Sequence, residues 1–213
     1  DSQFERLTDS TLVAALPADR SFHYPWIGWE IYEDDYAKTE NLNQIGRVED
    51  LYLGTAARIE LGVSPAHAGT PTTTLLDARA RTSFSWNAGL QVLQLGATAT
   101  GRWQNESGLD NALFETSGEY FWRSGDKHVW YARLDGTLAH DPDPDTQLLL
   151  GGDNGLRGYP LRYQAGNARA LLTLEHRYFT DWYPFRLMRV GGAVFFDAGR
   201  TWGADVVGTD NLG

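Results

Sequence analysis

Cysteine is absent from this chain of 213 residues. A disulfide framework and a thiolate metal site are therefore excluded. No run of 18 apolar residues occurs, so the sequence contains no candidate transmembrane helix. A membrane-spanning strand hides its apolar residues at every second position, and this absence therefore leaves a transmembrane β-barrel open.

Positive charge is also scarce. The formal net charge is -10, whereas a nucleic-acid-binding protein needs a basic face. Lysine occurs only at Lys38 and Lys127, so nearly every cation on the predicted strands is an arginine. No nucleophile elbow, phosphate loop or zinc motif is present. We therefore expect no nucleic-acid partner, no enzymatic activity and no cofactor.

One acidic segment invites comparison with a metal site. Asp141, Asp143 and Asp145 occupy alternate positions, as they do at the start of a calcium loop. The sixth position is Thr146 instead of glycine, and the twelfth is Gly152 instead of glutamate. We expect no bound metal and interpret the segment as a stiff, acidic, solvated loop.

What the sequence does contain is alternation of apolar and polar residues with a period of two. The longest example runs from about Asp50 to Val63. Many such segments approach a dozen residues, whereas soluble strands usually have about five or six and tilted transmembrane strands need about nine to eleven. The pattern predicts an all-β protein of roughly eight antiparallel strands, at residues 26–32, 50–63, 76–87, 93–103, 112–123, 130–138, 170–178 and 188–197.

The two faces of these strands differ in chemistry. One face is nearly uncharged and carries aromatic side chains towards the strand ends, as in the interfacial girdles of membrane proteins. The other face combines arginine with carboxylates, which indicates a bidentate network across neighbouring strands of a polar lumen. The predicted lumen network consists of Arg58, Glu60, Arg79, Arg81, Glu115, Arg133, Asp135, Glu175 and Arg177.

Connection lengths support the same interpretation. Short connections near 87–89, 124–126 and 180–185 alternate with longer ones at 64–73, 104–111 and 140–167. Short turns at one rim and long loops at the other are typical of outer-membrane barrels. The segment 37–46 is longer than a turn should be and breaks this rule.

The longest connection contains a glycine-rich segment, residues 151–160, which we call the glycine loop. Four glycines in ten residues indicate a tight, specifically shaped loop, because glycine permits positive φ and close backbone approach. The loop has an arginine in its middle, followed by an aromatic residue. Its candidate site residues are Gly151, Gly152, Gly155, Leu156, Arg157, Gly158 and Tyr159.

The glycine loop resembles the signature of the long extracellular loop in the outer-membrane assembly-factor superfamily. This superfamily, often labelled bacterial surface antigen, includes BamA, TamA and the transporters of two-partner secretion. The later run from Val194 to Trp202 resembles the matching strand signature, in which an aspartate stands two residues before a glycine. Its candidate residues are Phe196, Asp197 and Gly199.

The resemblance implies a barrel of roughly sixteen strands, usually preceded by periplasmic POTRA domains. It implies that the long loop folds into the lumen, where Arg157 pairs with Asp197. Gly155 and Gly158 then let the backbone turn, and Tyr159 packs against the barrel wall. It also implies a protein that assembles outer-membrane proteins or translocates polypeptide across the outer membrane of a Gram-negative bacterium.

Domain organisation follows from these assignments. Residues 1–25 form an N-terminal extension with a short amphipathic helix between Phe4 and Pro17, and residues 26–213 form part of a barrel. The chain begins with neither an initiator methionine nor a signal peptide, so we expect a fragment whose unpaired edges need more strands or self-association to complete the sheet. Outer-membrane lipid and unfolded or secreted polypeptide are the expected partners.

Two alternatives belong to other classes. The first is a soluble, tryptophan-rich β-sandwich that binds glycans through Trp86, Trp103 or Trp122. The second is the barrel tail of a larger protein whose N-terminal passenger or enzyme domain has been lost.

Overall fold

The computed structural model describes residues 19–144 and 146–203, and this part of the chain is all-β. Its only helical element is a single 3-10 turn, η1 (Pro184–Arg186). No helix among the described residues has the length and apolar character needed to cross a membrane. The short helix expected between Phe4 and Pro17 falls on residues outside the described ranges.

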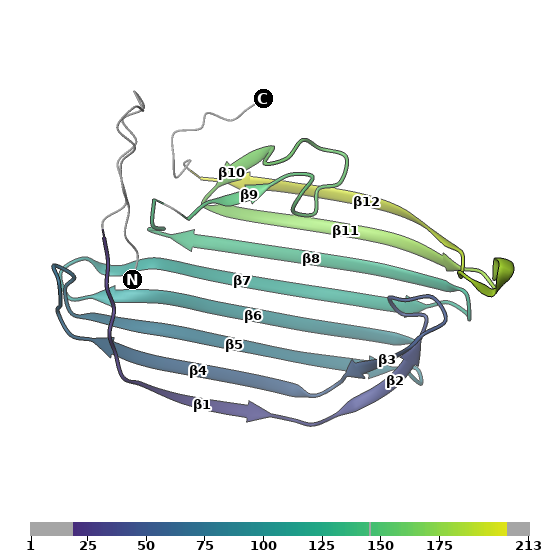
Figure 1. Cartoon of the computed structure of the whole chain (residues 1–213), viewed down its shortest axis with the longest axis horizontal. Helices are drawn as coiled ribbons and strands as arrows, with labels where there is room; N and C mark the ends of the chain where they lie inside the picture. Colours follow the sequence, from purple (N-terminus) through teal and green to yellow (C-terminus); the bar gives the residue numbers. More distant parts are fainter. Residues whose placement is uncertain (1–18, 145, 204–213) are drawn as a thin grey trace.

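Eight antiparallel strands form one large sheet, as the period-two pattern predicted. Figure 1 shows these strands lying side by side in the order β1-β4-β5-β6-β7-β8-β11-β12. Their bounds are β1 (Trp26–Tyr32), β4 (Thr55–Ser64), β5 (Thr73–Trp86), β6 (Gln91–Gln104), β7 (Gly108–Arg123), β8 (His128–His140), β11 (Ala168–Phe179) and β12 (Gly191–Trp202). Six of these strands have 12 residues or more, at least twice the roughly five or six residues of an ordinary soluble strand.

The sheet is open. β1 pairs only with β4, and β12 pairs only with β11, so each outer strand has one unpaired edge within the described chain. The remaining sheets have two strands each, β2 (Tyr36–Glu40) with β3 (Val48–Tyr52) and β9 (Leu148–Leu150) with β10 (Gln164–Gly166). The described residues therefore contain no second large sheet of the kind that a β-sandwich requires.

Apolar side chains lie exposed on one face of the large sheet. Along β7, Phe114 and Trp122 are 46% and 43% exposed, whereas Phe121, which points to the other face, is 1% exposed. The same outward face carries Leu95, Trp103, Leu134, Leu174, Val194 and Phe196. The opposite face carries the charged residues and is the face that the two small sheets cover.

The strand expected from Asp50 to Val63 is broken, and this prediction was wrong. β3 ends at Tyr52 and β4 begins at Thr55. Gly54, which lies between them in a bend, is buried. A Cβ atom at this position would stand 2.4 Å from the carbonyl oxygen of Glu33, so only glycine lets the two backbone segments approach this closely. Leu53 packs against a buried cluster instead of facing outward with Ile59.

That cluster is the larger of two small cores on the charged face. The β2–β3 hairpin, together with its connection, folds back over the sheet near the turns between β5 and β6 and between β7 and β8 (Figure 1). Leu42 and Leu51 of the hairpin form one buried cluster there with Val92, Phe121 and Val129 of the large sheet. The connection at 37–46, which did not fit the short-turn rule, thus belongs to an inward-folded hairpin.

The bounds of other strands and connections also differ from the predicted ones. Met188 and Val190 precede β12, because the chain from Thr180 to Val190 is a connection that includes η1. The connection between β6 and β7 is short, because β7 already begins at Gly108. The rule of short turns at one rim and long loops at the other therefore holds only in part. The expected long connection at 140–167 is present, with β9 and β10 inside it.

Candidate functional site

The glycine loop connects β9 to β10 and lies on the charged face of the sheet. Leu156 at its centre is 2% exposed and packs with Leu150 of β9 and Leu171 of β11. The backbone N–H groups of Leu156 and Gly152 donate to the carbonyls of Gly151 and Pro160, at 3.0 Å in each case. These contacts fix the loop as a compact unit whose apolar centre faces the sheet.

Two glycines give the loop its shape through their backbone angles. Gly155 has φ +107° and Gly158 has φ +88°, values that side-chain-bearing residues rarely adopt. They flank Leu156 and Arg157. The turn at these positions presents Leu156 to the core and Arg157 to the neighbouring strand β12.

Arg157 makes a bidentate ion pair with Asp197 of β12. Its Nε and Nη2 donate to Oδ2 and Oδ1 of Asp197 at 2.7 and 2.8 Å, and its backbone N–H reaches Oδ2 at 3.2 Å. The Asp197 side chain is only 1% exposed. Hydrogen bonding to Asp197 raises the pKa of the Arg157 guanidinium above its usual range, so the group stays charged.

The same guanidinium reaches a second carboxylate. Nη1 of Arg157 donates to Glu175 on β11 at 2.7 Å, and Glu175 also accepts from Nε of Arg177 at 2.8 Å. The carbon at the centre of the Arg157 guanidinium lies 3.7 Å from the ring centre of Phe195, within cation–π range. Arg157 is therefore held by two acids and an aromatic face.

Two of the expected site residues, Phe196 and Tyr159, make no ion-pair or ring contact with Arg157 or Asp197 within the described chain. Phe196 points outward and is 59% exposed, and its neighbour Phe195 is the residue that contacts Arg157. Tyr159 is 49% exposed and lies against the ring of Tyr163 in the same segment, so its packing against a barrel wall stays a prediction. Sequence alternation could have identified the face of Phe195, because it lies two residues from Asp197.

Gly199 provides space for the loop core. A Cβ atom there would stand 2.8 Å from Cδ2 of Leu150 and 3.0 Å from the carbonyl oxygen of Ala170. Gly151 and Gly152 serve a similar purpose inside the loop. Their Cβ atoms would approach the backbone of residues 159–163 to between 2.4 and 2.8 Å. These glycines permit close approach of backbone segments.

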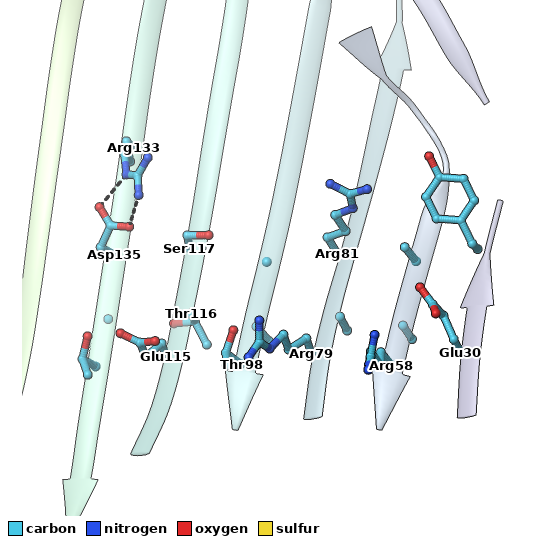
Figure 2. A pocket seen from close by; sticks show the side chains of 18 of the residues that line it. Glu30, Arg58, Arg79, Arg81, Thr98, Glu115, Thr116, Ser117, Arg133 and Asp135 are labelled. Carbon is cyan, nitrogen blue, oxygen red and sulfur yellow. Dashed lines mark hydrogen bonds and ion pairs between the residues drawn. The ribbon is translucent and has the colours of Figure 1, made fainter. Parts of the chain in front are cut away.

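Beside the glycine loop, a hollow of about 610 Å³ crosses the charged face. Its lining comes from seven neighbouring strands, from Glu30 on β1 to Arg169 on β11, so this face is concave. Figure 2 shows Arg58, Arg79, Thr98 and Glu115 side by side on successive strands, consistent with their cross-strand register. The hollow is lined by both signs of charge.

The predicted lumen residues share this face, but most of their ion pairs run along a strand. Arg58 pairs with Glu60, Arg79 with Asp77, and Arg177 with Glu175, each two residues away. Arg133 combines both directions. It binds Asp135 on its own strand with two hydrogen bonds, at 2.6 and 2.8 Å, and Glu119 of β7 at 2.6 Å. The expected network across strands is thus only partly present.

Two predicted members of the network make no ion pair within the described chain. Arg81 lies 4.4 Å from the ring centre of Tyr52 and contacts no carboxylate there. Glu115 lines the hollow (Figure 2) without a cationic partner among the described residues. Both groups remain available to a ligand or substrate in the hollow.

The acidic segment after β8 is partly buried, which corrects its interpretation as solvated. Asp143 is 8% exposed and accepts from Nη2 of Arg102 at 2.5 Å and from Arg20. Arg102 also donates to Asp110 at 2.7 Å. In the described ranges, no cluster of three or more metal-ligating side chains occurs.

The β2–β3 hairpin is the part of this face that the sequence did not reveal. Its tip contacts β11, because Nη1 of Arg177 donates to the carbonyl of Leu42 and to Oδ1 of Asn43, both at 3.1 Å. The only available signal was the excess length of segment 37–46. Alternation continued through Leu51 and Leu53 and concealed the turn at Gly54.

Comparison with known proteins identified no relative: no family model, no curated protein and no solved structure matches this chain. The geometry of the concave face and the motifs in the sequence are therefore what indicates a function for this chain.

Proposed function

We propose that this chain is part of a transmembrane β-barrel in the outer membrane of a Gram-negative bacterium. The barrel belongs to the outer-membrane assembly-factor or bacterial surface antigen superfamily, and it inserts outer-membrane proteins or translocates polypeptide. The observation that carries the proposal is the glycine loop, which lies on the charged concave face with Arg157 bound to Asp197. This is the arrangement that the resemblance implies.

The outward face supports a membrane environment. Trp86 pairs with Gln91 of β6, Gln91 pairs with Trp122, and Trp122 pairs with Trp130, which gives three exposed tryptophans at one level. Trp103 marks the other end of β6. From Gln91 to Trp103 the strand advances about 40 Å at ~3.3 Å per residue. At a tilt of ~40° this corresponds to about 30 Å, the thickness of a bilayer core.

The open edges support a barrel that further strands complete. β1 and β12 both present unpaired backbone groups, and such groups are not tolerated in lipid. The partner strands come from other parts of the same protein or from self-association. A closed barrel of this kind encloses the concave face as a polar lumen, which the glycine loop occupies.

In this proposal, a polypeptide substrate passes over the concave face when the glycine loop moves. Arg157 and Asp197 set the stability of the occluded state. Removing one partner of a buried ion pair costs about 3 kcal/mol or more, and the partial exposure of Arg157 (37% of its side chain) places the cost at the lower end. That cost is enough to change the position of the loop.

The test replaces Arg157 in the intact gene of a Gram-negative host. With Arg157→Ala, we expect most of the activity to be lost, measured as the amount of folded outer-membrane protein and of secreted polypeptide. Arg162→Ala is the matched control, because Arg162 lies in the same segment, is exposed, and makes no side-chain ion pair within the described chain. Normal levels of both products with Arg157→Ala would contradict the proposal.

A further inference from the structure

Two segments fold onto the concave face from opposite rims of the sheet. The glycine loop enters from the rim where β8 ends and β11 begins, and the β2–β3 hairpin enters from the rim where β1 ends and β4 begins. Each has its own small core, Leu150, Leu156 and Leu171 for the loop, and the cluster around Phe121 for the hairpin. The two cores share no residue.

Glu175 on β11 lies between these segments. Its Oε1 accepts from Arg157 of the glycine loop at 2.7 Å, and its Oε2 accepts from Arg177 at 2.8 Å. The Glu175 side chain is 12% exposed. Because each oxygen serves a different arginine, one carboxylate bridges the loop to the residue that holds the hairpin.

At the hairpin end of this bridge, Arg177 is hydrogen-bonded to the tip of the β2–β3 hairpin. Arg177 donates to the carbonyl of Leu42 and to the side chain of Asn43. The tip is itself fixed, because Glu49 accepts from the backbone N–H groups of Asn43 and Gln44 at 2.9 and 2.7 Å. A displacement of the hairpin therefore moves the acceptors of Arg177.

Both guanidinium groups are also restrained by aromatic rings. Arg157 lies over Phe195 at 3.7 Å, and Arg177 lies over Tyr131 at 4.4 Å. These contacts keep each arginine on the sheet beside Glu175, to which each guanidinium donates one hydrogen bond. Loss of either arginine leaves the other facing an incompletely satisfied carboxylate.

We propose that Glu175 is a positioning residue that couples the glycine loop to the β2–β3 hairpin, so that the two segments leave the concave face together. The coupling itself stands on the contacts above. Its consequence, joint opening of an occluded lumen, rests on the proposed function. In a substrate-conducting barrel, this bridge lets an event at one rim regulate access at the other.

The experiment measures amide hydrogen exchange by mass spectrometry on the full chain in detergent micelles. Arg177→Ala breaks the bridge on the hairpin side, and the variant should also accelerate exchange in residues 151–163, which Arg177 does not contact. Arg157→Ala should accelerate exchange in residues 36–52 in the same way. We expect about fivefold or more, the lower range of coupling between protein sites. Glu175→Gln should accelerate exchange in both segments.

Two controls separate coupling from general loss of stability. Exchange in β5 should stay unchanged in the Arg157, Arg177 and Glu175 variants. Arg79→Ala, which breaks the separate Arg79–Asp77 ion pair on the same face, should affect neither the glycine loop nor the hairpin. If Arg177→Ala accelerates only the hairpin and Arg157→Ala only the loop, the coupling is refuted. That result would leave the proposed function intact, because secretion and assembly are measured separately.

Discussion

Arg157 attaches the glycine loop to the concave face through several contacts at once. Its side chain contacts Asp197, Glu175 and the ring of Phe195, and its backbone N–H also reaches Asp197. No neutral side chain can satisfy both carboxylates. Lysine would keep the charge, but it lacks the planar arrangement of donors that binds Asp197 with two hydrogen bonds.

The glycines of the loop are required for two different reasons, and substitutions can tell them apart. At Gly158 the constraint is φ +88° with open space around a Cβ atom, whereas at Gly151 the constraint is backbone 2.5 and 2.6 Å away. Gly158→Ala should cost about 1–2 kcal/mol of unfolding free energy, and Gly158→Asn less, because asparagine tolerates positive φ.

Gly151 should show the opposite order. Gly151→Ala forces the backbone of residues 160–162 to move and should cost about 1–3 kcal/mol, and the larger asparagine should cost more. The measurement is urea unfolding of the full chain in phospholipid vesicles. Equal effects of alanine and asparagine at both positions would show that neither constraint operates as described.

At the scale of elements, the β2–β3 hairpin depends on its small core. Phe121 is 1% exposed and lies 4.9 Å from Tyr131 between ring centres. Phe121→Ala should destabilise the protein by about 3–5 kcal/mol, because it opens a cavity beneath the hairpin. Phe114→Ala, an outward position on the same strand, should cost less than about 2 kcal/mol, since in the proposed membrane setting lipid would fill the space.

Urea unfolding in vesicles again measures both variants. The account would be wrong about the hairpin core if Phe114→Ala proved more costly than Phe121→Ala. Such an outcome would mean that the sheet packs through its outward face.

Local periodicity made the long strands predictable, and its limits explain the errors. From β5 to β8 most side chains alternate between outward and inward faces, so these faces could be assigned without knowledge of their neighbours. The exception is the register shift where Thr100 pairs with Leu113 but Arg102 pairs with Asp110. Leu51 and Leu53 continue the alternation of β4 although the chain turns at Gly54. Only the contact of that hairpin with residues far along the sequence, such as Arg177, distinguishes it from a strand.

The candidate site, like the strands, could be predicted from the sequence only in part. The motif resemblance implied the pairing of Arg157 with Asp197, and alternation placed Glu175 and Arg177 on the polar face. The bridge through Glu175 depends on where the loop and the hairpin meet above β11. No local pattern encodes that meeting, because it joins residues more than a hundred positions apart.

At the scale of the whole molecule, the stability of the sheet depends on what covers its exposed apolar face. An eight-stranded sheet with exposed tryptophan, phenylalanine and leucine on one face is unstable in water unless that face is covered. In the proposed barrel, lipid would cover this face, and the charged groups of the concave face would stay hydrated in the lumen. The fold and the proposed function both depend on this separation.

Spin-label accessibility along β7, in the middle of the sheet, tests this separation most directly. Because the chain has no cysteine, single cysteines introduced from Ala112 to Trp122 carry unique labels in the protein reconstituted into lipid vesicles. The account predicts a period of two, with labels at Phe114, Thr116 and Tyr120 relaxed by oxygen dissolved in the bilayer. Labels at Glu115, Ser117 and Glu119 should be relaxed by a water-soluble nickel complex. Equal access of the nickel complex to both sets would contradict the account.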